Sequence, residues 1–395
     1  MKASGKPFVP GKLTLLTIIL SSMVIIMGSA AVAPALRPIQ QYFGESEFMV
    51  SLIISLPSLS VAVCGFAIGL LADRLGKAKV LIIALAIFTI AGTAGFLTDS
   101  FALLLASRFI LGVGLAGISL TATALIGEYY GGMQRSKVIG YQTAATGVGT
   151  LLMETVGGAL ADIGWNYPFL IYLIGAPIIA FGLLSVRDSS RIVRDDRGEA
   201  PMSNVPADTG GMRKVIICYA AVFLEMFLMF TAPMNFSYYI AEMDQPYIMM
   251  GILLGIMGFT QAVFSIIYTR RISRPSDPVA FSLAFMAMGI ALAMLYVQFL
   301  PITFVSMVVM GCSMGMLMPT VISRLSMLST YRTSGKIMGG YAVFINMSIF
   351  VCSLVFAPLL AVMGSYCSSY LFLGVFALIV AAVVFVSGRL GVASR

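Results

Sequence analysis

The stretch that decides the fold is GLLADRLGKAKVL at residues 69–81, which carries four charged side chains between two long apolar runs. These runs, at 48–71 and 79–97, each have the length of about 20 residues with which a helix crosses the hydrocarbon core of a bilayer. A polar connection this short between two such runs predicts a pair of antiparallel membrane helices joined by a tight turn.

The same pattern recurs along the whole chain. Of the 395 residues, 59% are hydrophobic and only 10% are charged, whereas soluble domains are about a quarter charged. Backbone groups in lipid must be bonded within their own segment, so we expect each membrane-length run to be a helix. The sequence therefore predicts an all-α polytopic membrane protein with spans at 13–35, 48–71, 79–97, 101–126, 137–161, 167–186, 214–240, 247–269, 278–299, 301–323, 336–361 and 368–388.

The placement of the basic residues predicts the orientation of the chain. When the loops are assigned alternately to the two sides, all of the 24 lysines and arginines except Arg37 and Arg108 fall on one side. Basic loops of membrane proteins remain in the cytoplasm. We therefore expect a plasma-membrane protein with both termini cytoplasmic and the first apolar run retained as a helix. The net charge of +8 is then a topology signal and not a site for nucleic acid.

A polar stretch and an internal repeat divide the chain into halves. Residues 187–212 are charged, contain two prolines and end near Gly-Gly, which is typical of a linker. On this basis we predict six-helix bundles at 1–186 and 213–395. Parallel repeats of this kind characterise one large class of secondary transporter. Two short segments recur in similar form at the same offset of 199 residues. SRFILG from 107 aligns with SMVVMG from 306, and RSKVIG from 135 aligns with SGKIMG from 334.

The stretch at 69–81 resembles the loop signature G-x-x-x-D-R-x-G-[KR]-[KR] of the major facilitator superfamily, with Ala78 at one usually basic position. The resemblance implies twelve helices in two pseudo-symmetric six-helix bundles. It also implies that Asp73 accepts bonds from basic groups and latches the cytoplasmic side shut. The alternative is a solvated turn placed by the charge rule. The latch implied by the resemblance comprises Gly69, Asp73, Arg74, Gly76, Lys77 and, at the start of helix 11, Lys336.

The run RFILGVGLAG at residues 108–117 places an arginine inside an apolar stretch of membrane length. Its glycines have the spacing of a dinucleotide-binding loop, but that loop needs a preceding strand and a solvated turn. We therefore interpret Gly112 and its neighbours as a helix-packing face. Arg108 resembles the helix 4 arginine of the family, which faces helix 1 and the central cavity. Its alternatives are a buried organising or functional role and a side chain that reaches the membrane surface.

The run GVGTLLMETVGGAL at residues 147–160 resembles the helix 5 motif G-x-x-x-G-P-x-x-G-G of the family's proton-coupled drug exporters. Gly149, Gly157 and Gly158 match the motif, and Met-Glu stands where the motif has Gly-Pro. The resemblance implies a helix-packing face at these glycines, and the sequence adds a carboxyl group at its centre.

That carboxyl group, Glu154, is predicted to lie at the same depth as Arg108. Each is about seven residues from the outer end of its helix, or about 10 Å at a rise of 1.5 Å per residue. Three interpretations stay open for Glu154. It forms an ion pair with Arg108 that joins helices 4 and 5, it contacts substrate or exchanges a proton, or it faces lipid.

A second intramembrane acid, Glu225, lies near the middle of the predicted span 214–240. Transporter sites lie near the bilayer midplane between the repeats, so we expect it to bind a proton or substrate. The alternatives are a polar core contact and a position at a helix end. Five more polar residues are either cavity contacts or interhelical bonds, namely Gln142, Asn235, Gln261, Tyr341 and Asn346.

The sequence also disfavours several classes of protein. It has no histidine, and its five cysteines have no paired spacing, so neither a metal site nor a disulfide framework is predicted. It has no phosphate-binding loop of a primary pump and no large extramembrane domain. We therefore do not expect an enzyme or a receptor.

The predicted function is secondary transport of a small organic solute by alternating access. The favoured form is proton-coupled efflux of amphipathic or drug-like compounds, for which the 27 methionines would provide a polarisable pocket surface. The alternative is an uptake symporter or facilitator for a small organic metabolite, including an anionic one bound by Arg108. We expect a monomer in the lipid bilayer that uses the proton gradient and no cofactor or metal, with a small-molecule substrate as its partner.

Overall fold

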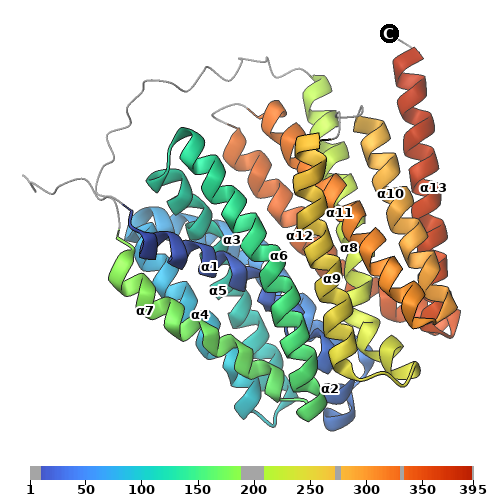
Figure 1. The fold of residues 1–395 in the computed structure, drawn as a ribbon, viewed down its shortest axis with the longest axis horizontal. Coiled ribbons are helices and arrows are strands. Elements are labelled where there is room, and N and C mark those ends of the chain that lie inside the picture. The colour runs from blue at the N-terminus through green and yellow to red at the C-terminus, as the bar shows by residue number, and fades with distance from the viewer. Residues whose placement is uncertain (1–9, 188–208, 272–276, 330–332, 394–395) are drawn as a thin grey trace, which may run out of the picture.

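The computed structural model describes residues 10–187, 209–271, 277–329 and 333–393, and the ordered elements in these ranges are all helical (Figure 1). The first group comprises α1 (Lys12–Ala30), η1 (Ala33–Ala35), α2 (Leu36–Phe43), α3 (Glu47–Leu75), α4 (Lys77–Leu97), α5 (Phe101–Tyr129), α6 (Gly132–Ile163), η2 (Tyr167–Ile174) and α7 (Gly175–Ser185). The second group comprises α8 (Thr209–Glu242), α9 (Tyr247–Arg271), α10 (Asp277–Met294), η3 (Leu295–Val297), α11 (Leu300–Leu328), α12 (Ser334–Met363) and α13 (Tyr366–Ala393).

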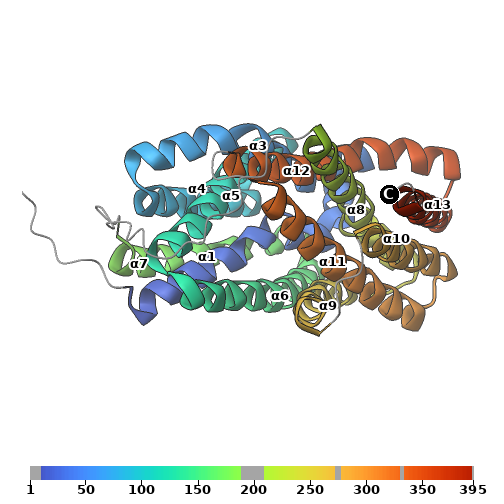
Figure 2. The same ribbon diagram turned by 90° about the horizontal axis from the view of Figure 1, so that it is seen from above.

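The two groups form two bundles that lie side by side. Figure 2 shows α1–α7 on one side and α8–α13 on the other, with α6 beside α9 and α3 beside α12 where the bundles meet. In the described part of the chain, eleven helices are long and apolar enough to cross a membrane, and Lys12–Ile25 of α1 is a shorter apolar stretch. The predicted all-α polytopic fold is confirmed.

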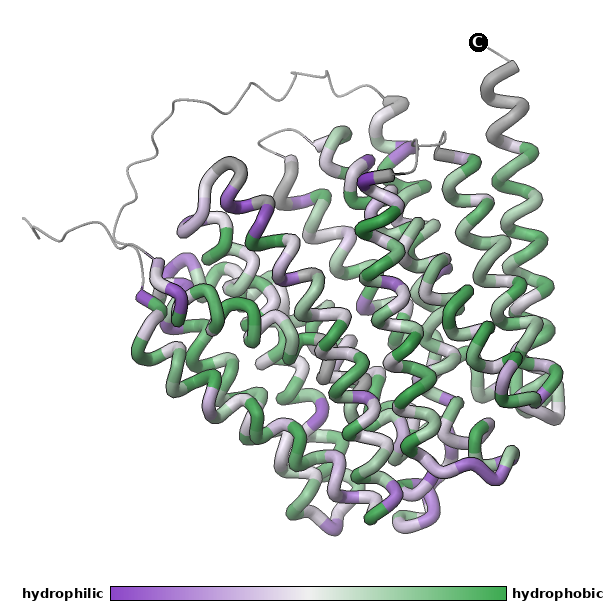
Figure 3. The backbone as a smooth tube through the Cα atoms, in the orientation of Figure 1, coloured by the Kyte–Doolittle hydropathy of each residue, from purple (hydrophilic) through white to green (hydrophobic). Residues whose placement is uncertain are grey.

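The outer surface of the bundles is apolar, as membrane helices require. Figure 3 shows hydrophobic residues along the length of the helices and hydrophilic residues gathered toward their ends. Large side chains such as Phe66, Leu97 and Val362 are about four-fifths exposed, at 81%, 82% and 79%. Exposed apolar surface on this scale would aggregate in water, so these side chains belong against lipid.

The turn between α3 and α4 shows why the opening stretch folds as it does. Gly76 adopts a φ of +98°, which a residue with a Cβ atom rarely tolerates, and it separates the end of α3 from the start of α4. At the other end of α3 the side chain of Ser46 accepts a hydrogen bond from the backbone N–H of Met49 (3.3 Å). Local turn and cap chemistry therefore sets the bounds of this span.

The structure changes the prediction at two places. The predicted first span, 13–35, is interrupted, because the segment Ala33–Ala35 around Pro34 is a short 3-10 helix and not a continuation of α1. The predicted linker at 187–212 lies largely outside the described residues, and its last residues are helical because α8 already begins at Thr209.

The two ends of the bundles differ in their basic residues and in how closely the two bundles approach each other. We call the end that holds the α3–α4 turn at Gly76 the basic end, because Lys77, Lys137 and Lys336 lie there in the first two turns of α4, α6 and α12. Several hydrogen bonds between the bundles lie in the opposite half of the molecule, and in one of them Ser353 of α12 donates to Ser55 of α3 (3.1 Å). Figure 1 shows α6 and α9 converging toward that opposite end and separating toward the basic end.

Candidate functional site

A cavity of about 530 Å³ lies between the two bundles. It is lined by α1, α3, α5 and α6 from one bundle and by α8, α9, α11 and α12 from the other. A volume of this size is in the range that holds a drug-sized molecule. The polar side chains in its lining are Ser58, Ser119, Thr146, Thr150, Glu154, Gln261, Ser265 and Asn346.

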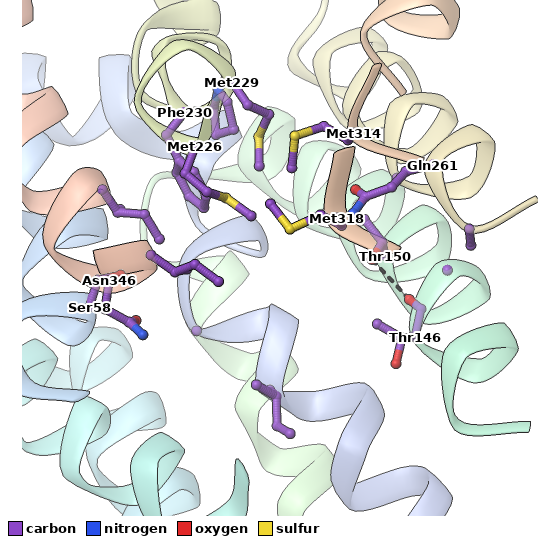
Figure 4. Close-up of a pocket in the computed structure, with 18 of the residues that line it drawn as sticks. Ser58, Thr146, Thr150, Met226, Met229, Phe230, Gln261, Met314, Met318 and Asn346 are labelled. Carbon is purple, nitrogen blue, oxygen red and sulfur yellow. Dashed lines mark hydrogen bonds between the residues drawn. The ribbon is translucent and has the colours of Figure 1, made fainter. Parts of the chain in front are cut away.

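The C-terminal side of the cavity is rich in methionine. Figure 4 shows Met226 and Met229 of α8 and Met314 and Met318 of α11 pointing toward a common space, with Phe230 beside them. Unbranched thioether side chains are flexible and polarisable, so they can repack around apolar surfaces of different shape. This wall suits contact with varied hydrophobic groups better than recognition of one rigid polar molecule.

Glu154 is the only ionisable side chain among the described residues that line the cavity. It is only 3% exposed, and its Oε2 atom has no hydrogen-bond partner among the described residues. A carboxyl group is costly to ionise when an oxygen is shielded from water and has no hydrogen-bond partner. It therefore has reason to hold a proton, or to attract a cationic or hydrogen-bonding group of a solute.

The interpretation that pairs Glu154 with Arg108 is wrong. Arg108 is fully buried, but its Nη2 donates to the backbone carbonyls of Ala91 and Gly92 in α4, both at 2.8 Å. Its guanidinium also lies over the ring of Phe169, 4.9 Å from the centroid. The two residues lie at similar depth in the membrane, but depth does not determine the direction of a side chain around its helix. Arg108 points from α5 toward α4 and η2, whereas Glu154 points from α6 into the cavity.

We predict that replacing Arg108 with alanine lowers the unfolding free energy by about 3 kcal/mol, because the two bonds from a charged donor are lost and their buried acceptors stay unpaired. Thermal melting of the purified protein in detergent measures this. Solute affinity should change little, since Arg108 is absent from the cavity lining. Arg108→Lys keeps the charge but not the planar guanidinium group, so its melting temperature should lie between those of the wild-type protein and Arg108→Ala. If Arg108→Ala melted at the wild-type temperature, a structural role for Arg108 would be contradicted.

Glu225 lies outside the cavity lining, buried inside the second bundle. Its Oε1 contacts Ser313 Oγ of α11, which is also 2.7 Å from the carbonyl oxygen of Ala284. One hydroxyl carries one hydrogen. Both contacts are therefore full hydrogen bonds only when Ser313 donates to Ala284 and a protonated Glu225 donates to Ser313. The geometry fits a neutral carboxyl group at this position.

The other polar residues singled out in the sequence divide into two sets. Gln261 and Asn346 line the cavity. The side chain of Gln142 instead donates to Ser22 Oγ in its own bundle (2.8 Å). Within the second bundle, Asn235 donates to the Thr231 carbonyl of its own helix (3.0 Å) and Tyr341 contacts Met318 Sδ (3.3 Å). These three residues are absent from the cavity lining.

The residues of the predicted latch are not joined across the bundles in this conformation. Asp73 and Lys336 are both exposed, and no contact joins them among the described residues. Lys77 forms an ion pair with Glu128 of α5 in its own bundle. Gly69 is not packed against a neighbour, and Arg74 lies exposed in the last turn of α3.

The glycines of the predicted packing faces lie against neighbouring helices. A Cβ atom on Gly112 would come within 2.3 Å of the carbonyl oxygen of Pro57 in α3. On α6, a Cβ atom on Gly149 would meet Met23 at 2.1 Å and one on Gly157 would meet the Ala31 carbonyl oxygen at 2.3 Å. Gly158 faces the other bundle instead, where a Cβ atom would lie 2.5 Å from the Tyr247 carbonyl oxygen.

Sequence reasoning missed most of the cavity wall, although a signal for it exists. The α8 residues of the wall, Met226, Met229, Phe230 and Pro233, have the spacing i, i+3, i+4, i+7 of one helix face. In a membrane helix apolar residues occupy every face, so the spacing does not separate a cavity face from a lipid face. Among the described residues no cluster of three or more metal-binding side chains is found.

Two bundles of membrane helices with a solute-sized cavity between them form the architecture of a membrane transporter. The sequence profile described as Major Facilitator Superfamily matches residues 18–275. The chain therefore belongs to the major facilitator superfamily, whose members are secondary transporters and not enzymes.

Curated relatives share less than half of their length with the chain. The Multidrug resistance protein Stp of Mycobacterium tuberculosis is 31% identical over 180 residues, 45% of this chain and 34% of that protein. The Probable 4-methylmuconolactone transporter of Cupriavidus pinatubonensis is 27% identical over 168 residues (41% and 39%), and the Bacillibactin exporter of Bacillus subtilis is 30% identical over 162 (38% and 40%). The chain thus spans about a third to two fifths of these relatives.

Solved structures resemble the chain over almost its whole length. A POT family transporter in complex with 5-aminolevulinic acid has a TM-score of 0.77 at 13% identity and covers 95% of this chain and 96% of that one. At this identity the resemblance concerns the fold alone, and it agrees with the all-α polytopic fold predicted from the sequence.

Proposed function

We propose that the protein exports amphipathic, drug-like organic compounds through the cavity between its bundles, in exchange for protons. The observation that carries the proposal is the cavity lining: an apolar, methionine-rich wall with one carboxyl group, Glu154, and no cationic side chain among the described lining residues. Such a lining favours solutes with a hydrophobic body and a neutral or positive group.

Relatives that carry different kinds of solute bear on the proposal. A multidrug resistance protein and an exporter are among them, which supports efflux. The 4-methylmuconolactone transporter favours the second candidate, movement of a small organic metabolite. Against an anionic metabolite stands the position of Arg108, which binds α4 carbonyls and leaves the cavity without its cation.

The two buried acids suggest how protons take part. Glu154 can exchange a proton for a solute directly, because both would occupy the same cavity. Glu225 lies next to Met226 in sequence, and Met226 lines the cavity. A change in protonation at Glu225 can therefore move α8 and reshape the methionine wall. We propose that protonated and solute-bound states alternate in the transport cycle.

The test of this function is a transport assay in inside-out vesicles with an imposed pH gradient. Three fluorescent probes cover the classes of solute: ethidium as a cation, Nile red as a neutral compound and fluorescein as an anion. The proposal expects an inside-acid gradient to drive accumulation of ethidium but not of fluorescein. Gradient-independent equilibration of a probe would indicate facilitated diffusion, and fluorescein as the sole substrate would support the metabolite alternative.

Replacing Glu225 with glutamine is expected to lower gradient-driven accumulation of ethidium about tenfold while changing its binding affinity less than about twofold, because the amide cannot release a proton and the residue is outside the cavity lining. The measurements are vesicle uptake and fluorescence titration of purified protein. Glu45→Gln, an acid replaced outside the helices, serves as the matched control. Wild-type uptake by Glu225→Gln would exclude this residue from coupling.

A further inference from the structure

Asp162 lies near the end of α6 and binds the N-terminus of α9 in the other bundle. The backbone N–H groups of Tyr247 and Ile248 donate to its two carboxylate oxygens, Oδ1 at 2.8 Å and Oδ2 at 3.0 Å. These are the first two residues of α9, and such N–H groups have no carbonyl partner within their own helix. A carboxylate there satisfies the donors and is favoured by the helix dipole. Asp162 therefore caps a helix across the boundary between the bundles.

The residue directly before the helix that Asp162 caps cannot act as a side-chain cap. Pro246 precedes Tyr247, and proline offers no side-chain oxygen. The helix with the corresponding place in the first bundle, α3, is instead capped by its neighbour Ser46. One half of the fold thus has a local cap, and the other takes its cap from the opposite bundle.

The surface of α6 is shaped for this contact. Gly158 lies one turn before Asp162, on the same face of the helix. A Cβ atom on Gly158 would come within 2.8 Å of the Cα atom of Ile248. The missing side chain allows the start of α9 to approach α6 closely, which brings its N–H groups under the carboxylate.

Other bonds between the bundles at this end come from neutral and charged groups, the latter being Arg37 with Tyr247 and Glu47 with Tyr366. The backbone N–H of Arg37 donates to Ser237 Oγ (3.1 Å), and Ser237 Oγ donates to the Pro34 carbonyl oxygen (2.9 Å). Asp162 differs from these groups because its charged side chain binds the backbone N–H groups that begin a helix of the other bundle. It also makes two such bonds at once.

We propose that Asp162 is a positioning residue of the transport cycle: it holds the bundles together at the end opposite the basic end, and its release from α9 accompanies opening there. In a conformation open at that end, α6 and α9 must separate, so both bonds are lost and the first N–H groups of α9 turn to water. The proposal rests on the two-bundle architecture and is independent of which solute is carried.

Distance measurements between spin labels test this proposal on the full chain, with the native cysteines replaced. One label pair, at Leu103 and Tyr296, spans the opposite end, and a second, at Lys137 and Met327, spans the basic end; all four side chains are exposed. Asp162→Ala should shift the ratio of conformations about fivefold toward longer distances at the opposite end and shorter ones at the basic end, as loss of one helix cap implies. Asp162→Asn, which keeps one acceptor oxygen, should shift it less.

The matched control is Asp244→Asn, because Asp244 is an exposed acid three residues before α9. It should leave both distance distributions unchanged. Unchanged distributions in both Asp162 variants would overturn the proposal, and so would a lower melting temperature without a change in distances, since that result assigns Asp162 a purely structural role.

Discussion

Replacing Glu154 with glutamine is expected to lower ethidium binding and ethidium export at least tenfold. Glu154 is the one ionisable group among the described lining residues, and burial strengthens the attraction between its charge and that of a cation, since the effective dielectric constant inside a protein is low. Glutamine has nearly the same size and shape but no charge. Fluorescence titration of purified protein and uptake into vesicles measure the two losses separately.

The same substitution carries its own controls. Binding of the neutral probe Nile red should change by less than about threefold, because its contacts are to the apolar wall. The melting temperature should stay the same or rise, since a neutral amide is less costly to bury without a partner than a carboxylate. Glu154→Asp should retain part of the ethidium binding. A Glu154→Gln protein that binds and exports ethidium normally would exclude Glu154 from the solute site.

The second large effect is expected at the seam between α6 and α9. A Cβ atom on Gly251 of α9 would lie 2.1 Å from the backbone carbonyl oxygen of Glu154 and 2.9 Å from the Cα atom of Thr155. Backbone atoms cannot move aside as a flexible side chain can. Gly251→Ala therefore forces the bundles apart, and we expect a destabilisation of about 1–3 kcal/mol, as for other overpacked contacts, with loss of most transport.

The chain offers a matched control for this substitution in Gly65 of α3, where an added Cβ atom would meet nothing within 4 Å. Gly65→Ala should melt at or above the wild-type temperature, because alanine is the better helix former. Thermal melting and vesicle uptake of the two variants test the comparison. Equal melting temperatures and equal transport would mean that the seam does not need the close approach at Gly251.

Most of the fold could be predicted from the sequence because membrane spans are determined by length and composition. The predicted span at 101–126, for example, corresponds to α5 at Phe101–Tyr129. Interruptions such as the 3-10 segment Ala33–Ala35 were not predicted, because they depend on how neighbouring helices replace the lost backbone bonds.

The site was predictable only in part, because direction around a helix axis is not encoded by depth. Both Glu154 and Arg108 are buried, in keeping with their intramembrane positions, but Arg108 turns to α4 and Glu154 to the cavity. Because a membrane helix is apolar on every face, its sequence does not indicate which face packs against a neighbouring helix. The role of Asp162 was invisible for a further reason, since its partners are backbone N–H groups in another bundle.

The proposed mechanism requires that solute binding in the cavity and proton binding by Glu154, the carboxyl group of its lining, exclude each other. Proton release on ethidium binding tests it most directly, with purified protein in weakly buffered detergent solution. We predict that wild-type protein releases a substantial fraction of a proton per bound ethidium, and that the double variant Glu154→Gln, Glu225→Gln releases none. Saturating ethidium binding to wild-type protein without proton release, at every pH at which the protein stays folded, would contradict the mechanism.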